Sequence, residues 1–375
     1  MDLSELRLQL DELDQRIVDI YEERMKICAQ VAEYKLLTGK KVLDKEREQQ
    51  KIEAVCALVH NDADRIGVRE LFEQIMAMSR KLQYQVLVEN GAISKLPFIE
   101  KEDLFSGEHK VVFQGAQGAY SQIAMQNFFG KDVSCFAVDT FRDAMGAIEE
   151  GRADFAVLPI ENSTAGVVSE IYDLLVEYEN YIVGEQVVKI EHCLLGLPEA
   201  KISDIRTVYS HPQSLMQTSH YLCEHPKWSQ IGMQNNAFAA KKVLEEHDLS
   251  QAAIASAYAG ELYGLKVLQS RISNDLSNST RFIIITNQKL FQSKATKISI
   301  CFEIHHESGA LYHALSHFIY NQLNLCKIES RPIENRNWEY RFFVDFEGNL
   351  LQSNVMNALR GLREETINMK ILGNY

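Results

Sequence analysis

Two basic residues interrupt an apolar seam near the N-terminus of this 375-residue chain. From Leu3 onward, apolar residues recur at alternating steps of three and four, which is typical of one face of a long helix. The series calls for an apolar residue where the sequence has Arg24. Lys35 follows about 16 Å further along such a helix and about 20° around it, so both side chains can lean into one space. Two cations on a buried helix face require an anion.

A third cation, Arg7, lies further towards the N-terminus. It precedes Arg24 by roughly 26 Å along the helix axis, too far for one helix copy to bring both onto one small molecule. A second chain could supply it. The ordinary alternative for a single such arginine is a stem packed at the edge of the stripe with its head in water. Only agreement among several residues favours an anion site.

The elements that must position these cations are helices. The first helical pattern runs from Leu3 to a break at residues 38–41, a second occupies about 45–60, and a third runs from about 68 to 88. No convincing strand pattern occurs in the first ninety residues. We therefore predict an all-helical domain over residues 1–90.

The segment LRLQLDELDQRIVDIYEER, its spacing to Lys35 and the loop DKERE resemble the all-helical chorismate mutase domain over about residues 3–88. In that family two intertwined chains share each site, which implies that Arg7 comes from the partner. Lys35 and Gln83 would donate to the ether oxygen, a contribution of about 3 kcal/mol in a dry site. Glu48 or Gln83 alone would suggest only a solvated helix face. The chorismate-binding residues that the resemblance implies are Arg7, Arg24, Lys35, Asp44, Arg47, Glu48, Ser79 and Gln83.

Polar residues also crowd the ends of three predicted strands in the middle of the chain. PIENSTAG (159–166) follows an apolar strand, SHPQ (210–213) precedes Gln217, and STRF (279–282) leads into another apolar strand. In an open α/β sheet such edges form the ligand crevice. These three clusters are therefore expected to meet at one site.

The surrounding stretch alternates short apolar runs with helical patterns, which indicates an α/β domain. The loop QGAQGAYS (114–121) lacks the third glycine of a dinucleotide fingerprint and the lysine of a P-loop, so NAD and ATP are not expected as cofactors. With the Thr-Arg-Phe triplet as its most specific mark, the stretch resembles the two-lobed α/β domain of prephenate dehydratase over residues 110–286. The prephenate-binding residues that this implies are Asn162, Ser163, Ser210, Gln217, Thr280, Arg281 and Phe282.

The implied reaction removes CO2 and the ring hydroxyl together, so the protein must assist a departing hydroxide. By resemblance Thr280 is the essential residue and Arg281 would hold a carboxylate. Because a threonine hydroxyl is a weak acid, a proton relay through Glu161 is a rival assignment. His211 and Glu161 could pair as acid and base, although a histidine before proline in a turn is more often structural. Residues 235–236 are Asn-Asn where relatives often carry Ser or Thr, so no contact is carried over from that loop.

The last segment, residues 297–375, shows the order βαββαβ. One motif, which begins at Gly309, lies at the first strand-to-helix junction of this segment. Another, ESRP (329–332), ends its second strand. Turn chemistry alone would explain each, but their pairing resembles the ACT regulatory domain, an α+β unit in which both motifs frame an L-phenylalanine site between paired domains. The effector-binding residues that this implies are Gly309, Ala310, Leu311, Glu329, Ser330, Arg331 and Pro332.

Composition limits the remaining possibilities. The formal net charge of −13 gives no basic footprint for nucleic acid. Seven cysteines without a CxxC pair favour a reducing compartment over a disulfide framework or a cysteine zinc site. No apolar segment is long enough to span a membrane. We predict a soluble cytoplasmic protein with a linker at 91–109, no metal or organic cofactor, and no nucleic-acid or membrane partner.

Together the resemblances imply a bifunctional enzyme of phenylalanine biosynthesis. It would take chorismate and prephenate as substrates, respond to L-phenylalanine, and act as a homodimer or a larger even assembly. One alternative is a regulator that binds aromatic ligands without turnover. Another is a helical dimerisation module, its mutase activity lost, fused to a dehydratase. Phenylpyruvate formation from prephenate tests the first, and chorismate consumption tests the second.

Overall fold

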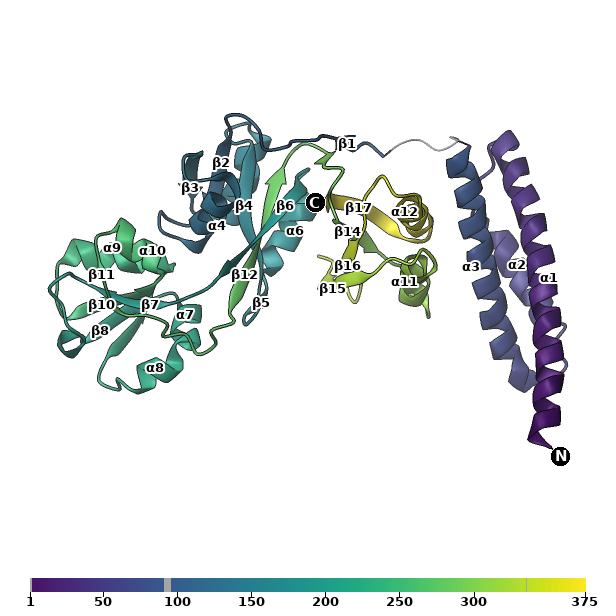
Figure 1. Ribbon diagram of the computed structural model, residues 1–375, viewed down its shortest axis with the longest axis horizontal. Helices are drawn as coiled ribbons and strands as arrows, with labels where there is room; N and C mark the ends of the chain where they lie inside the picture. Colours follow the sequence, from purple (N-terminus) through teal and green to yellow (C-terminus); the bar gives the residue numbers. More distant parts are fainter. Residues whose placement is uncertain (1, 91–95, 335) are drawn as a thin grey trace. The chain divides into compact units, whose positions relative to one another are not determined.

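The computed structural model describes residues 2–90, 96–334 and 336–375 (Figure 1). The chain divides into two compact units. One combines Met1–Pro97 with Thr296–Ile371, and the other combines Phe98–Ala295 with Leu372–Tyr375. Residues 91–95, which are part of the predicted linker at 91–109, lie outside the described residues.

The first unit begins with three helices, where the sequence predicts them. Asp2 caps the first helix, since its carboxylate accepts from the main-chain N–H of Ser4, and Gly39 ends it with a φ of 68°. The first and second helices both pack on the third. No strand occurs within the described residues 2–90, which confirms a helical N-terminal region. The elements are α1 (Leu3–Thr38), α2 (Lys45–Cys56), a short 3-10 turn (Asp62–Asp64) and α3 (Arg65–Glu89).

The apolar seam of α1 is exposed in the single chain. Leu10, Ile17 and Ile20 are each about three-fifths exposed (58%, 59% and 63%), and Ala32 is the buried residue of this helix. Burying a side chain of this size contributes about 1.5–3 kcal/mol relative to leaving it in water. A run of such residues is therefore a surface that another protein surface would cover.

The second part of this unit follows the predicted order βαββαβ. Its strands form a sheet in the order β15-β16-β14-β17, with β16 antiparallel to both of its neighbours. The two helices pack on each other, and Ile298, Ile300 and Phe302 are buried. The elements are β14 (Lys297–Glu303), α11 (Ala310–Tyr320), β15 (Leu325–Pro332), β16 (Tyr340–Glu347), α12 (Ser353–Glu365) and β17 (Ile367–Asn374). The last residues of β17, from Leu372, belong to the second unit.

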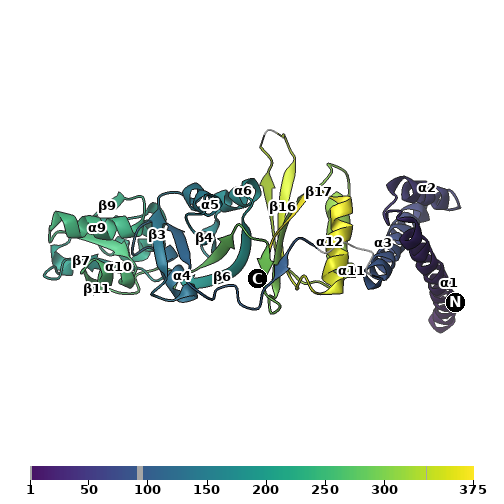
Figure 2. The same ribbon diagram turned by 90° about the horizontal axis from the view of Figure 1, so that it is seen from above.

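The second unit has two lobes, and the first contains strands in the order β6-β12-β4-β2-β3. β12 runs antiparallel to β6 and β4, whereas β2 is parallel to β3 and β4. One helix covers one face of this sheet and two helices cover the other (Figure 2). The strands are β1 (Ile99–Glu100), β2 (Lys110–Gln114), β3 (Ser134–Val138), β4 (Phe155–Asn162), β5 (Gly166–Val167), β6 (Tyr181–Lys189), β12 (Ser279–Thr286) and β13 (Leu290–Phe291), and the helices are α4 (Tyr120–Phe129), α5 (Phe141–Glu149) and α6 (Ser169–Glu177).

The second lobe is inserted between β6 and β12. Its sheet has the order β11-β7-β10-β8-β9 with both parallel and antiparallel pairs. The middle of the chain is thus an α/β region with two lobes, as predicted, and the structure shows that both of its sheets are mixed. Its elements are β7 (Cys193–Gly196), a 3-10 turn (Ile202–Asp204), β8 (Thr207–Ser210), α7 (Pro212–Gln217), α8 (Ser219–Cys223), β9 (Ser229–Gly232), α9 (Asn236–Glu246), β10 (Gln251–Ala255), α10 (Ala257–Leu262) and β11 (Lys266–Gln269).

Three further observations concern the chain as a whole. Within the described ranges, no helix combines the length and the apolar character needed to cross a bilayer. Over the same ranges, no three His, Cys, Asp or Glu side chains gather as a metal site would require. Within the described ranges, none of the seven cysteines forms a disulfide.

Candidate functional site

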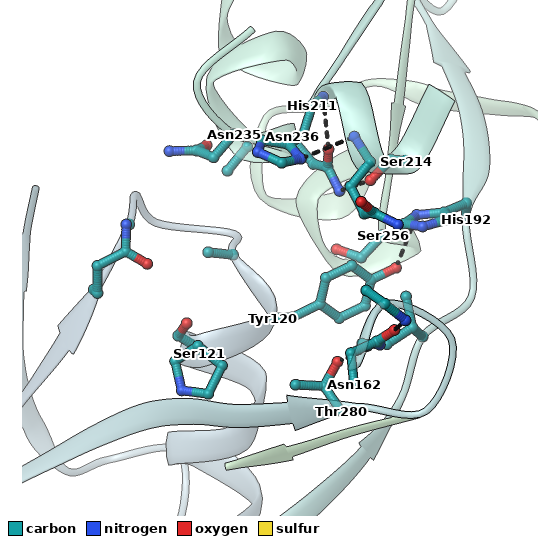
Figure 3. A pocket seen from close by; sticks show the side chains of 18 of the residues that line it. Tyr120, Ser121, Asn162, His192, His211, Ser214, Asn235, Asn236, Ser256 and Thr280 are labelled. Atoms are coloured by element: carbon teal, nitrogen blue, oxygen red, sulfur yellow. Dashed lines mark hydrogen bonds between the residues drawn. The ribbon is translucent and has the colours of Figure 1, made fainter. Parts of the chain in front are cut away.

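The second unit holds a cavity of about 280 Å³ that is lined by residues of both lobes (Figure 3). Asn162 and Thr280 reach it from strands of the first lobe. Tyr120 at the start of α4 and Asn236 at the start of α9 also line it. Strand ends and helix N-termini therefore meet here, as expected for the crevice of an α/β fold.

A hydrogen bond between Asn162 and Thr280 joins two of the predicted site residues. Asn162 Nδ2 donates to Thr280 Oγ1 at 2.9 Å. The other end of the amide is fixed, because Asn162 Oδ1 accepts from the main-chain N–H groups of Thr164 and Ala165 at 3.1 and 2.8 Å. Since the Thr280 oxygen already accepts, its own hydrogen remains available for donation to a molecule in the cavity.

Strand alternation separates Thr280 from its neighbour in the Thr-Arg-Phe triplet. Thr280 pairs in register with Asn162, and Arg281 pairs with Glu161. Successive side chains point to opposite faces of a sheet, so Thr280 and Asn162 share the cavity face. The Arg281 guanidinium instead lies 3.3 Å from the carboxylates of Glu161 and Glu185. Neither Arg281 nor Glu161 lines the cavity, so the structure brings neither the expected carboxylate contact nor the expected proton relay to it.

Some of the other predicted dehydratase residues line the cavity, and others lie outside it. Gln217 and Phe282 line the cavity. Ser163 does not, and its Oγ accepts from the first main-chain N–H of β12 at 3.0 Å. Ser210 is fully buried and donates to a main-chain carbonyl of β10 at 2.7 Å. These two serines support the strands that carry the site.

Residues 235–236, from which we carry over no contact, line the cavity. Asn236 Oδ1 accepts from the main-chain N–H of His211 at 3.0 Å, and its Nδ2 donates to Ser214 Oγ at 2.9 Å. These bonds tie the start of α9 to the start of α7. The His211 ring accepts from the N–H of Gln213 and so caps α7, which agrees with the structural interpretation, and burial lowers its pKa.

Sequence reasoning also missed Tyr120 and His192. The Tyr120 hydroxyl donates to the carbonyl of Glu191 at 2.8 Å, and its ring lies edge-on to that of His192. His192 is only 1% exposed, and burial lowers its pKa. Tyr120 belongs to the glycine-rich loop 114–121, whose sequence indicates only the start of a helix. His192 belongs to no motif, so no sequence signal marks it as a site residue.

The described residues that line this cavity include no lysine or arginine. Tyr120 and Ser121, the first residues of α4, are among the lining residues, and Ala119 provides no side-chain cap for this helix. The N–H groups of Tyr120 and Ser121 are among those that a helix leaves without an internal acceptor. Together with the positive end of the helix dipole they favour an anion.

In the first unit, Lys35 lies beside two carboxylates expected at the mutase site. Its ammonium donates to the carbonyl of Val42 at 2.6 Å. Burial lowers the pKa of Lys35, while the charges of Glu48 and Asp44 act in the opposite direction. Asp44 also caps α2 by accepting from the N–H of Arg47 at 3.0 Å. Lys35, Asp44 and Glu48 are thus brought together from α1 and α2.

On α3, Ser79 and Gln83 are buried, and Gln83 Nε2 donates to Ser79 Oγ at 3.3 Å. Gln83 Oε1 is buried without a hydrogen-bond partner among the described residues. Arg80, which the sequence did not single out, forms an ion pair with Glu48 at 2.5 Å. Arg80 directly follows the predicted site residue Ser79 in the sequence, and this position is the signal that could have identified it.

The arginines of α1 are not gathered around Lys35. Arg24 is half-buried, with Nη1 3.7 Å from Cys28 Sγ. Arg7 is exposed and lies about 40 Å from Lys35 along α1. A single chain therefore assembles only part of the predicted set.

The two predicted effector motifs lie at a helix start and at a sheet edge. Gly309 precedes α11 with a φ of 82°, a conformation in which a side chain would be strained. Ser330 and Arg331 end β15, which is the edge strand of its sheet. Along that strand half-buried and exposed residues alternate.

Two family models match the chain. Residues 6–84 match the family described as chorismate mutase type II, and residues 111–290 match prephenate dehydratase. The bifunctional chorismate mutase/prephenate dehydratase of Enterobacter agglomerans is 32% identical over 383 residues, which cover 100% of this chain and 95% of that protein. The corresponding protein of Escherichia coli K12 is 31% identical and is covered to 96%.

Solved structures also resemble the chain. The prephenate dehydratase of Arthrobacter aurescens in complex with L-Phe is 28% identical, with a TM-score of 0.66, over 71% of this chain and 89% of that one. GqqA, described as a novel type of quorum quenching acylase, is 31% identical, with a TM-score of 0.65, over 70% of this chain and 96% of that one.

Proposed function

This chain belongs to the family of bifunctional chorismate mutase/prephenate dehydratases, and on that basis we propose how its residues divide the two reactions. The enzyme rearranges chorismate to prephenate and then removes CO2 and water from prephenate to give phenylpyruvate, two steps of phenylalanine biosynthesis. We assign the first reaction to residues 1–90, the second to 110–286 and regulation to 297–375. The hydrogen bond from Asn162 to Thr280 carries the assignment of the dehydratase site.

In the dehydratase reaction, Thr280 donates its hydroxyl hydrogen to the departing ring hydroxyl. Loss of CO2 leaves an electron pair that aromatises the ring as the C–O bond breaks, so negative charge develops on the leaving oxygen. A donor held in place before the reaction stabilises that charge. Asn162 keeps the Thr280 hydrogen pointed into the cavity by donating to its oxygen.

One carboxylate of prephenate is held by main-chain donors. Because no lysine or arginine is found among the described lining residues, a carboxylate meets the N–H groups of Tyr120 and Ser121 at the start of α4. Arg281 acts on the other face of β12, where it holds Glu161 and Glu185 and so fixes the strand that presents Thr280.

The mutase reaction needs no proton transfer, nucleophile or metal, because it is a unimolecular rearrangement. Arg24, Arg47 and an Arg7 from a second copy of the chain hold the two carboxylates of chorismate and favour the compact reactive conformer. Lys35 and Gln83 donate to the ether oxygen as it gains negative charge. Lys35 is half-buried, and this burial lowers the pKa of its ammonium.

The mutase site is completed by a second copy of this chain. Arg7 lies too far along α1 to reach Lys35 of its own chain. The exposed seam of α1, which includes Leu10, Ile17 and Ile20, supports a helix-to-helix interface between copies. A homodimer that packs this seam would bring the partner's α1, and with it a second Arg7, to the site. The seven widely spaced cysteines, without a CxxC pair, support a reducing, cytoplasmic setting.

L-phenylalanine binds to residues 297–375, which we assign to the ACT domain class. The βαββαβ order and the Arthrobacter aurescens relative solved with L-Phe support this assignment. The effector contacts are Gly309 to Leu311 and Glu329 to Pro332. If phenylalanine lowers the affinity for prephenate, prephenate must lower the affinity for phenylalanine by the same factor.

Assays of the purified full chain on chorismate and on prephenate, each with and without L-phenylalanine, test these assignments. We expect prephenate from the first substrate, phenylpyruvate from the second, and inhibition by phenylalanine. Binding of prephenate without phenylpyruvate formation would instead identify an aromatic-ligand regulator. Dehydratase activity without consumption of chorismate would identify a lost mutase.

A further inference from the structure

His192 is a buried histidine at the dehydratase cavity that the two proposed reactions do not use. It lies between β6 and β7, and its main chain is anchored on both sides. Its N–H donates to Ser273 Oγ at 3.2 Å, and its carbonyl accepts from the N–H of Ile272 at 3.1 Å. The imidazole ring therefore occupies a fixed place beside Tyr120 (Figure 3).

The contacts of the ring determine which nitrogen carries the hydrogen. Nε2 of His192 lies 3.1 Å from Gln217 Oε1. The amide nitrogen of Gln217 is already directed elsewhere, because it donates to Thr164 Oγ1 at 2.8 Å. An amide oxygen only accepts, so Nε2 of His192 must be the donor.

The other nitrogen faces Tyr120. Nδ1 of His192 lies 3.4 Å from the Tyr120 oxygen, and the Tyr120 hydroxyl donates to the carbonyl of Glu191. Burial lowers the pKa of His192 and so keeps the ring neutral, with its single hydrogen on Nε2. The buried ring therefore presents one donor, and that donor points at Gln217.

Gln217 connects His192 to the reacting centre. Its Nε2 donates to Thr164 Oγ1 and lies 3.5 Å from Asn162 Oδ1. If the Gln217 amide were reversed, its oxygen would face the oxygens of Thr164 and Asn162. The Asn162 amide, whose orientation points the Thr280 hydrogen into the cavity, would then lose a favourable neighbour.

We propose that His192 is a positioning residue for the dehydratase reaction, which acts by holding the Gln217 amide in the one orientation that supports Asn162 and Thr280. This inference rests on the proposed dehydratase function. The proposed role requires the Nε2–H donor of His192, not the bulk or the charge of its ring. It involves no direct contact between His192 and the substrate.

A matched pair of variants separates the donor from the ring. In H192Q the side-chain amide can place an N–H near the position of Nε2, whereas the shorter side chain of H192N cannot. Leaving a buried acceptor without its donor costs enough to lower kcat on prephenate by about 5- to 150-fold in H192N. We expect H192Q to recover most of that loss and KM to change less than about twofold in both variants.

A double-mutant cycle with Gln217 tests the route. In a Q217L background, H192N should change kcat by less than about twofold, because the amide through which it acts is gone. S273A is the control that removes one main-chain anchor of His192 but keeps the ring. Because the second anchor, from the N–H of Ile272, and the contact with Gln217 remain, we expect S273A to keep kcat within about twofold of the wild type. The mutase rate of each full-length variant reports that the protein is folded and correctly quantified.

Several results would overturn the proposal. H192N with a wild-type kcat, H192Q as impaired as H192N, or additive losses in the Q217L background would each exclude positioning through Gln217. A rise in KM alone would assign the ring to substrate binding. T280A distinguishes this failure from that of the proposed function: if T280A keeps dehydratase activity, the site itself is assigned wrongly, whatever His192 does.

Discussion

At the scale of single residues, the two proposed sites offer different kinds of donor. The proposed dehydratase cavity offers a hydroxyl and side-chain amides, with no lysine or arginine among its described lining residues. The mutase region instead gathers an ammonium beside carboxylates, at Lys35, Asp44 and Glu48. Because the two sets lie on different segments of the chain, single substitutions should separate the two activities.

Thr280→Ala should lower dehydratase kcat by about 10²- to 10⁴-fold, the usual contribution of a positioned proton donor. The rate of the mutase reaction should stay at the wild-type value. The measurements are phenylpyruvate formation from prephenate and prephenate formation from chorismate. Thr280→Ser keeps the hydroxyl and should retain most of the activity, and an equally inactive serine variant would argue against donation by Thr280.

Lys35→Ala should lower mutase kcat by about 10²- to 10³-fold and leave the dehydratase reaction unchanged. The ammonium is the active form, and its pKa lies below the ordinary value of 10.5. The mutase rate of the wild type should therefore fall as the pH rises through that lowered pKa. Lys35→Gln donates without titrating and should lack this alkaline fall, so a fall that persists in Lys35→Gln would assign it to another group.

At the scale of elements, strand alternation and helix starts decide what reaches a site. The Thr-Arg-Phe triplet reads as one motif in the sequence, yet β12 turns Thr280 and Phe282 to the cavity and Arg281 to the other face. Likewise the junction between β14 and α11 depends on Gly309, since its φ of 82° is one that other residues adopt only with strain.

Gly309→Ala should weaken inhibition by phenylalanine, because relief of about 1–2 kcal/mol of backbone strain displaces the start of α11. We expect the inhibition constant to rise by up to about 30-fold with little change in the uninhibited dehydratase rate. Gly264→Ala is the matched control, since Gly264 also has a positive φ (65°) but lies between α10 and β11. If phenylalanine inhibits Gly309→Ala and Gly264→Ala as strongly as the wild type, the effector assignment is refuted. Wild-type inhibition of Ser330→Ala would refute it as well.

At the scale of the whole molecule, we propose that two chains share each mutase site; the exposed α1 seam and the distance of Arg7 from Lys35 support this proposal. Shared sites of this kind have a consequence that no single-chain enzyme shows. Two inactive variants, each defective in a different half of the site, can form one intact site in a mixed dimer.

Arg7→Ala and Lys35→Ala should each lack mutase activity alone but recover it when the two proteins are unfolded and refolded together. Random pairing gives mixed dimers with one of two sites intact, so about a quarter of the wild-type activity should return. Dehydratase activity of the same samples corrects for refolding yield. No recovery in a sample whose mixed dimers are verified by mass would show that Arg7 acts within its own chain.

The sequence alone determined the helical N-terminal region, the α/β middle with its polar strand ends, and the final βαββαβ order. Periodicity and turn residues act locally, so they can be read from one chain. The tertiary structure decided which of those polar residues share a space: Arg281 and Glu161 turned away from the cavity, whereas His192 and Asn236 entered it. These contacts depend on strand register and on two lobes meeting, which bring together residues far apart in the sequence and which no local pattern records.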